Sequence, residues 1–236
     1  YDKLIMYYGE TNATVPLVLS GDIDYATHAF PPANVKTFAA MPNYKILGGT
    51  TATGPGLWFN QTVYPLSKVE VRQAFAYVID RKENATVAFG DAGKAIQYMA
   101  GFTDAMVPGW LSKDTIDKLN PYNKDLKKAE SLLTGIGFKK GADGIWLDDK
   151  GKPLAFELSV PSDFIDWLTT AENAAQQLTK FGIKATVRGY QSADRATVQR
   201  DGKYQILVDL TTYTHPPPQQ TAFHYGLNGT RRTARR

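Results

Sequence analysis

The first part of the chain consists of short apolar runs separated by glycine and proline. Such runs, bounded by turn residues, are typical of strands, and the stretches between them have the composition of short helices. We expect strands at 3–8, 23–26 and 44–47, and helices at 12–20 and 31–41. This alternation of strands and helices predicts an α/β lobe.

The strongest helical pattern in the chain covers residues 67–79. Val71 and Phe75 stand at positions i and i+4, a spacing that places them on one face of a helix. Ser67 stands three residues before Glu70, which predicts a capping box at the start of this helix. We therefore expect a helix with one buried face here.

The rest of the chain repeats the alternation. The elements that we expect are a strand at 57–60, a helix at 81–89, an irregular stretch at 90–120, a helix at 124–134, a hairpin made of 145–147 and 154–158, a helix at 163–181 capped by Asp163, a strand at 183–187, a helix at 192–200 and a strand at 204–210. From this order we predict that residues 57–227 form one α/β lobe, in which the helix at 67–79 packs on a sheet. That sheet is expected to contain the strands at 154–160, 183–187 and 204–210.

The composition is that of an ordinary globular protein, with 43% hydrophobic and 21% charged residues among 236. The chain contains no cysteine, which excludes disulfides, cysteine-ligated zinc, iron–sulfur clusters and a cysteine nucleophile. Its three histidines form neither an HExxH nor a His-x-His pattern. We expect no metal site, no cofactor and no catalytic residue.

The net charge of +4 comes from the end of the chain. Four arginines in the last six residues belong to the 27 Lys and Arg, so the remaining 23 balance the 23 Asp and Glu. Without its last six residues the chain has no net charge, which does not support a nucleic-acid-binding face, and we expect no nucleic-acid partner. Residues 230–236 are expected to form a disordered basic tail. No apolar stretch reaches the ~18 residues that a membrane span requires.

Four segments of the chain carry motifs in a familiar order. They are 57–81 with Leu-Trp-Phe-Asn and Val-Arg-Gln-Ala-Phe-Ala-Tyr-Val-Ile-Asp-Arg, 20–26 with Ser-Gly-Asp-Ile-Asp-Tyr-Ala, 120–138 with Asn-Pro-Tyr-Asn, and 174–184 with Ala-Ala-Gln-Gln-Leu and Phe-Gly-Ile-Lys. In order and spacing these segments resemble those of the family 5 extracellular solute-binding proteins, the oligopeptide, dipeptide, nickel and oligosaccharide receptors of ABC importers. The resemblance extends to about residue 227.

The resemblance implies an α/β fold of the periplasmic-binding-protein type (type II, two lobes). It implies that residues 1–56 are the terminal part of the first lobe and residues 57–229 most of the second, with a hinge near Asn60. The implied function is a solute receptor, not an enzyme, that binds an oligosaccharide or oligopeptide between the lobes and delivers it to a membrane permease. The implied location is periplasmic or extracellular, and a lipid anchor on a leader absent from this chain would fit the family.

The resemblance also points to a ligand-binding segment after the last strand, where the family pattern is W-x-A-D-Y-x-x-P. Matching Tyr213 and Pro216 to this pattern places Thr212 at the aspartate and Asp209 at the tryptophan. In peptide receptors that aspartate pairs with the free amino group of the ligand. The anchoring carboxylate is therefore absent here, or displaced to Asp209. A buried ammonium without a carboxylate partner is costly, so a neutral solute such as an oligosaccharide is favoured.

Sugars present C–H faces that stack on aromatic rings, which makes the tryptophans further candidates for ligand contact. Any single tryptophan is more often a core residue. Trp167 is favoured because it stands near a helix start, and Trp110 because it stands in a loop. The candidate ligand-binding residues are Thr212, Tyr213, Asp209, Trp167, Trp110 and Trp58.

Two other functions remain open from the sequence. A carboxylate-dependent glycoside hydrolase could use Asp163 and Asp166 as an acid–base pair, although aspartates at a helix start are more often caps. The chain could also be a folded fragment that binds nothing. An assay of turnover on glycosides separates the first function from a receptor, and a thermal-shift screen of ligands separates the second.

Overall fold

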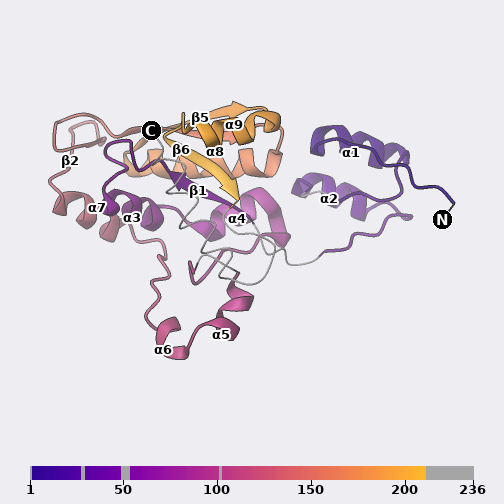
Figure 1. Cartoon of the computed structure of the whole chain (residues 1–236), viewed down its shortest axis with the longest axis horizontal. Helices are drawn as coiled ribbons and strands as arrows, with labels where there is room; N and C mark the ends of the chain where they lie inside the picture. The colour runs from indigo at the N-terminus through magenta and orange to yellow at the C-terminus, as the bar shows by residue number, and fades with distance from the viewer. Residues whose placement is uncertain (1, 28–29, 49–53, 101–102, 211–236) are drawn as a thin grey trace.

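The computed structural model describes residues 2–27, 30–48, 54–100 and 103–210, which Figure 1 draws as coloured ribbon. The predicted tail at 230–236 lies outside the described residues, as does the end of the predicted lobe beyond residue 210.

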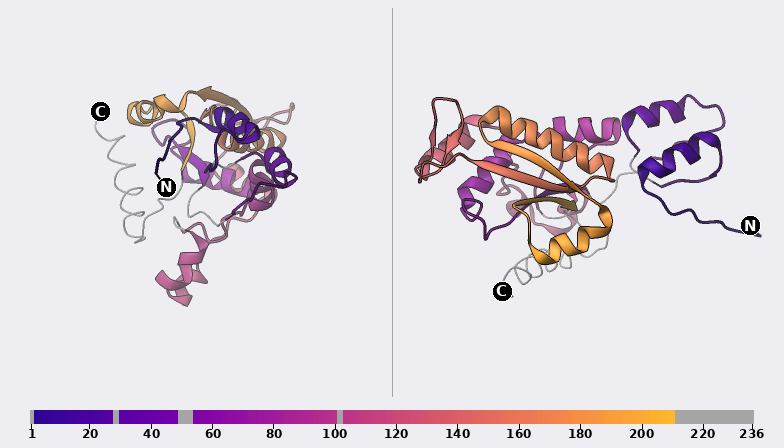
Figure 2. Two further views of the ribbon diagram at one scale, coloured as in Figure 1. Left: turned by 90° about the vertical axis from the view of Figure 1, so that its right-hand side faces the viewer. Right: turned by 90° about the horizontal axis from the view of Figure 1, so that it is seen from above.

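Two helices form near the start of the chain, as predicted. α1 spans Thr11–Ser20 and α2 spans Pro32–Ala39. The hydroxyl of Tyr44 donates to the carbonyl of Val18 at 2.6 Å, and the Tyr44 ring stacks on Phe38 with 6.4 Å between centroids. The two helices lie side by side and apart from the sheet of the molecule (Figures 1 and 2).

The strands expected at 3–8, 23–26 and 44–47 do not form, so this part of the prediction is wrong. A strand needs backbone hydrogen bonds from a neighbouring strand. None of the described residues supplies such a neighbour here, and the apolar side chains stay exposed, 82% for Leu4 and 97% for Tyr8. A short apolar run alone is therefore not enough to make a strand.

Four strands form one mixed sheet farther along the chain. In spatial order they are β1 (Pro55–Phe59), β6 (Ile206–Leu210), β4 (Ala155–Pro161) and β5 (Lys184–Tyr190). β6, β4 and β5 run parallel, whereas β1 runs antiparallel to β6. The sheet contains the three strands that the sequence predicts in it, with β1 added at one edge.

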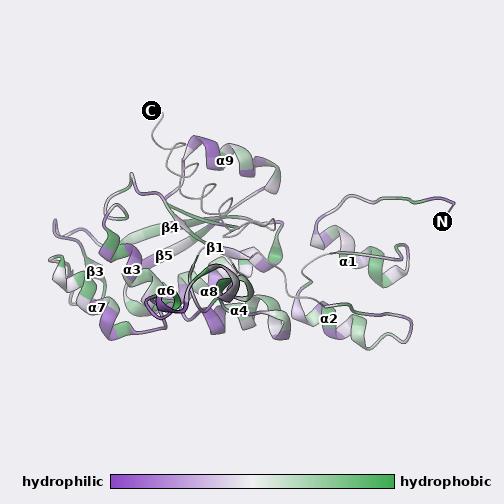
Figure 3. Ribbon diagram, turned by 60° about the horizontal axis from the view of Figure 1, so that its bottom comes forward, coloured by the Kyte–Doolittle hydropathy of each residue, from purple (hydrophilic) through white to green (hydrophobic). Residues whose placement is uncertain are grey.

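Helices cover both faces of this sheet. The longer ones are α3 (Val69–Val78), α4 (Arg81–Phe89), α7 (Leu126–Gly135), α8 (Ile165–Phe181) and α9 (Arg195–Asp201), which follows the short η3 (Ser192–Asp194). α8 packs on β4 and β5, α3 packs against α7, and α4 packs against α8. α9 lies on the other side of the sheet from α8 (Figures 2 and 3).

The hydrophobic core lies between the sheet and the layer made of α3, α7 and α8. Phe75 of α3 is fully buried, and its ring meets Phe59 and Phe156 edge-on at centroid distances of 5.3 and 5.6 Å. Hydrophobic and hydrophilic residues alternate around these helices, as expected for helices with one buried face (Figure 3). The predicted packing of the helix at 67–79 on the sheet is thus confirmed.

Shorter elements complete the described chain. They are η1 (Gly90–Ala92), η2 (Asp104–Met106), α5 (Val107–Trp110), α6 (Lys113–Ile116), β2 (Lys139–Lys140) and β3 (Trp146–Leu147). α5 and α6 project from the body of the molecule (Figures 1 and 2). None of the helices in the described part of the chain is long and apolar enough to cross a membrane.

The predicted hairpin is only partly correct. The turn forms, because Asp148 N–H donates to the Lys152 carbonyl at 2.8 Å and Leu147 bridges Pro153. However, β3 pairs with β2 in a separate two-stranded sheet, and β4 continues into the main sheet instead.

The capping box predicted at Ser67 is also wrong, since Lys68 is the N-cap of α3 and no side chain caps the helix. Arg72 reaches back instead, and its Nη1 donates to the carbonyls of Leu66 at 2.8 Å and Ser67 at 3.0 Å.

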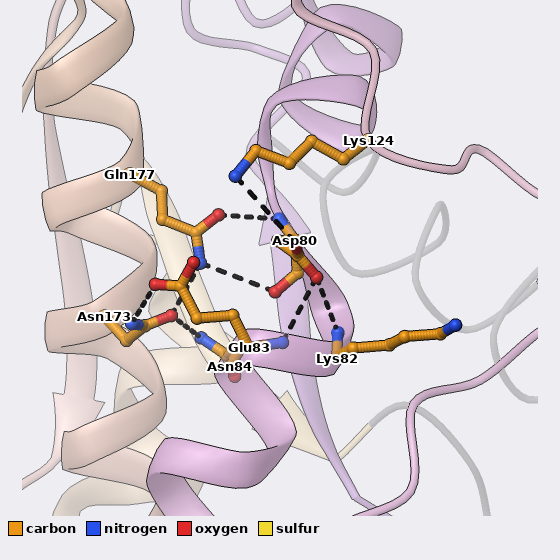
Figure 4. A network of polar contacts seen from close by, with 7 residues as sticks. All are labelled: Asp80, Lys82, Glu83, Asn84, Lys124, Asn173 and Gln177. Carbon is orange, nitrogen blue, oxygen red and sulfur yellow. Dashed lines mark hydrogen bonds and ion pairs between the residues drawn. The ribbon is translucent and has the colours of Figure 1, made fainter.

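A network of polar side chains joins the start of α4 to the middle of α8 (Figure 4). Gln177 Oε1 accepts from the backbone N–H of Asp80 at 2.6 Å, and Gln177 Nε2 donates to Asn173 Oδ1 at 2.7 Å. Asn173 donates to Glu83 at 3.0 Å and accepts from Asn84 at 3.1 Å. Because these groups satisfy one another, they fix α4 on α8.

Candidate ligand-binding site

The three parallel strands end at one edge of the sheet. β4 ends at Pro161, β5 at Tyr190 and β6 at Leu210. In open α/β sheets, ligands bind outside the carboxyl ends of the strands. A ligand-binding site is therefore expected at this edge.

Asp209 lies near this edge, on β6, and its side chain is only 4% exposed. Arg195, from the start of α9, forms an ion pair with it: Arg195 Nε lies 3.1 Å from each carboxylate oxygen, and Arg195 Nη2 also donates to Oδ1. Gln199, one helical turn farther along α9, donates to Oδ2. The negative charge of this buried carboxylate is thus compensated within the chain.

Two of the candidate tryptophans lie beside this ion pair. Trp167, in the first turn of α8, is buried, and the Arg195 guanidinium lies 5.2 Å from the centroid of its ring, within cation–π range. The indole N–H of Trp58, on β1, donates to the carbonyl of Leu210 at 3.1 Å. The structure therefore brings together three of the residues chosen from the sequence: Asp209, Trp167 and Trp58.

The loops that follow β4 and β5 are tied to each other at the same edge. Asp163 accepts hydrogen bonds from the N–H of Ser192 at 2.9 Å and from its hydroxyl at 2.5 Å. Ser162 N–H donates to the carbonyl of Tyr190 at 2.8 Å. Asp163 therefore links two loops and does not cap α8 as predicted, because the N-cap residue is Phe164 and no side chain caps that helix.

Tyr190 adds a buried hydroxyl at the end of β5. Among the described residues this hydroxyl has no hydrogen-bond partner. Burial, together with the negative charge of Asp209, raises the pKa of Tyr190 above its ordinary value. The tyrosine therefore stays neutral at physiological pH.

The other candidates lie elsewhere. Trp110 is on α5, 46% exposed, in the projecting part of the chain, and takes no part in the cluster around Asp209. Thr212 and Tyr213 lie outside the described residues. Asn60, the predicted hinge residue, is buried, and its Nδ2 donates to the carbonyls of Gly202 at 3.1 Å and Tyr204 at 2.9 Å.

Sequence reasoning missed Arg195 and Gln199. One signal could have revealed them, since residues four apart on the predicted helix at 192–200 share a face and come shortly before the strand that carries Asp209. Among the described residues, no three His, Asp or Glu side chains are grouped so that they could hold a metal ion.

Comparison with known proteins identifies the family. The profile of the bacterial extracellular solute-binding proteins, family 5 Middle, matches residues 1–232. The chain belongs to this family. The motifs at 20–26, 57–81, 120–138 and 174–184 thus indicated the right relatives.

Curated relatives of this family 5 chain include proteins from Brucella ovis and Brucella abortus, both provisionally named ABC transporter peptide-binding proteins. Each is 29% identical over 143 residues, which is 59% of this chain and 24% of the relative. The chain thus spans about a quarter of the length of these relatives.

Solved structures share the fold. A periplasmic oligopeptide-binding protein of Thermotoga maritima, bound to mannohexaose, has a TM-score of 0.74 and 23% identity over 93% of this chain and 42% of its own. NikZ of Campylobacter jejuni, in complex with Ni(L-His), has a TM-score of 0.74 and 24% identity over 91% and 40%. AgaA of A. tumefaciens R10, in complex with agropinic acid, has a TM-score of 0.66 and 27% identity over 86% and 37%. The predicted α/β fold of a periplasmic binding protein is confirmed.

Proposed function

We propose that this chain acts in the solute receptor of an ABC importer. In this proposal the receptor is periplasmic or extracellular, optionally held by a lipid anchor, and delivers its solute to a membrane permease. The ligand, an oligosaccharide or an oligopeptide, binds at the carboxyl edge of the sheet. Family membership supports the receptor role, and the receptors with known structures bind solutes as different as mannohexaose and Ni(L-His).

The observation that carries the proposal is the cluster of Trp58, Trp167 and the Arg195–Asp209 pair at the strand ends. This cluster combines aromatic rings with a fixed ion pair at the carboxyl ends of the parallel strands, where ligands of open α/β sheets bind. The hydrogen bonds between Asp163 and Ser192 hold the loops after β4 and β5 together at the same edge. This side of the proposed site is therefore preorganised before a ligand binds.

We further propose that residues 1–56 belong to a first lobe and residues 57–229 to a second. α1 and α2 lie apart from the sheet, which supports this division. The two lobes would close on the ligand by a hinge motion. In this proposal, contacts from both lobes contribute to the affinity. This chain covers about two fifths of the length of its structural neighbours.

Calorimetric titration tests the proposal, carried out on this chain and on the complete encoded protein where that is longer. The probes are mannohexaose, cello-oligosaccharides, short peptides, Ni(L-His) and agropinic acid. We expect saturable binding of one of these classes, weakened by Trp58→Ala and unaffected by Trp110→Ala. Hydrolysis of the oligosaccharides, or equal binding by the Trp58→Ala variant, would contradict a receptor site at this edge.

A further inference from the structure

The carboxylate of Asp209 has no capacity left for a ligand. Oδ1 accepts from Arg195 Nε, from Arg195 Nη2 and from the N–H of Leu210 at 2.6 Å, and Oδ2 accepts from Arg195 Nε and from Gln199. A carboxylate offers about four lone-pair positions to donors. These five contacts therefore saturate it, and all of them come from this chain.

Arg195 also stands on the outer side of the pair. Its side chain is 32% exposed, whereas that of Asp209 is 4% exposed, so a ligand reaches the carboxylate only by displacing the guanidinium. The guanidinium is held from a second direction by the face of the Trp167 ring. Displacement would break a bidentate ion pair and a cation–π contact at once.

We propose that Arg195 occupies the position beside Asp209 that the amino group of a ligand would otherwise take. Arg195 thereby excludes from this site the solutes that are anchored by a free ammonium. The inference rests on the proposed receptor function. It assigns to Arg195 a specificity-determining role, and to the ligand a group at this position that carries no positive charge.

The physical reason is competition between a tethered and a free cation. Arg195 is attached to α9 beside the carboxylate, so it pays no loss of translational freedom when the pair forms, whereas a free ligand does. A ligand ammonium that displaced it would also leave a guanidinium to be accommodated next to its own positive charge. The exchange therefore gains nothing, and a neutral or hydroxyl-bearing group is better matched to the outer face of the pair.

Removal of Arg195 tests this directly, because it leaves Asp209 buried without its cation. We expect the Arg195→Ala variant to melt at a lower temperature and to be rescued by millimolar ethylguanidinium or methylammonium, which fill the vacated position. Tetramethylammonium, which has the same charge but no N–H donor, should not rescue it. The Arg195→Ala/Asp209→Asn double variant should show no rescue by any of these cations.

Arg200→Ala is the matched control, because Arg200 lies on the same helix with a side chain 68% exposed, and its guanidinium contacts Asp201 and Thr197 instead of Asp209. It removes the same charge and should respond to none of the cations. If Arg195→Ala folds only in the presence of ethylguanidinium, recovery of the folded state replaces the melting shift as the readout. Absence of rescue, or equal rescue of the double variant, overturns the proposal.

Ligand titrations separate this inference from the receptor function itself. The native protein should bind peptides and their N-acetylated forms without distinction, and Arg195→Ala should prefer the free amino form by about tenfold or more. If the native protein distinguishes them, and Asp209→Asn abolishes the distinction, Arg195 does not exclude the ammonium and the proposal is overturned. Rescue of Arg195→Ala by cations, in a protein that binds no solute, would show that a free cation can take the place of Arg195, but it would refute the receptor function and the specificity role that rests on it.

Discussion

The contact between Gln177 and the start of α4 gives a direct test of how α4 is held on α8. Gln177 is 6% exposed, and its amide serves both the N–H of Asp80, at 2.6 Å, and Asn173 Oδ1, at 2.7 Å (Figure 4). Gln177→Leu keeps nearly the same volume and removes both bonds, together with a longer one from Gln177 Nε2 to the Asp80 carbonyl at 3.4 Å. The Asp80 N–H then has no acceptor, whereas Asn173 Oδ1 keeps its bond from Asn84 at 3.1 Å.

The expected loss of stability comes mainly from the Asp80 N–H, which loses its acceptor, since the two oxygens that accept from Gln177 Nε2 each lose only one donor. A buried donor without a partner costs about 1–3 kcal/mol, and burial of the leucine methyl groups offsets part of that cost. We expect Gln177→Leu to lower the free energy of unfolding by about 2 kcal/mol. For a domain of this size, that corresponds to a melting temperature lower by roughly 4–8 °C.

The matched control is Gln176→Leu, the same substitution at the next position of α8, where the side chain is exposed. It should change the free energy of unfolding by less than about 0.5 kcal/mol. Urea and thermal denaturation give the two values, and amide hydrogen exchange at Asp80 should accelerate only in Gln177→Leu. Equal stabilities of the two variants would show that the network in Figure 4 does not hold α4 on α8.

Three further outcomes are expected. Phe75→Ala, at a fully buried position between two aromatic rings, should lower the free energy of unfolding by about 3–5 kcal/mol, and urea denaturation that gave under 1 kcal/mol would contradict the core described. Gly182→Ala should melt far below the native protein, because Gly182 has φ +102° and a Cβ there would collide with the carbonyl of Gly144, and native-like melting would rule out this close approach. Burial raises the pKa of Tyr190 above its ordinary value of 10, so the folded protein keeps a proton that the unfolded chain loses above about pH 10. The free energy of unfolding should therefore fall as pH rises beyond that point, less steeply in Tyr190→Phe, and an equal slope in both proteins in urea denaturation would contradict the burial of this hydroxyl.

The parts of the fold that the sequence predicts well are those with strong local signals. The helix at 81–89 has the bounds of α4, because Asp80 accepts from the N–H groups of Lys82 at 3.0 Å and Glu83 at 3.1 Å and so fixes its start. The apolar run at 3–8 has an equally clear pattern and forms no strand. Helical hydrogen bonds are local, but those of a strand come from another segment, whose presence the pattern of one run cannot indicate.

The candidate site, like the fold, could be predicted from the sequence only in part. Asp209 and two tryptophans could be chosen from residue type and position, and the structure gathers them. The partner of Asp209 is harder to choose, because the spacing of Arg195 and Gln199 places them on one face of a helix but does not show that this face meets β6. Whether a carboxylate is open to a ligand or already paired depends on how the helix packs on the strand, which residue spacing does not encode.

The alternation along β6 explains why a charge can be kept at this edge. Ile206 and Val208 belong to the hydrophobic core under α8, whereas Leu207 and Asp209 do not, and successive side chains of a strand point to opposite faces. A shift of β6 by one residue would turn the carboxylate into the core, away from Arg195, and leave it unpaired. The ion pair thus favours a single register of β6 between β1 and β4. The pair that would close Asp209 to a ligand ammonium is therefore also a pair that holds the end of β6 in position between β1 and β4.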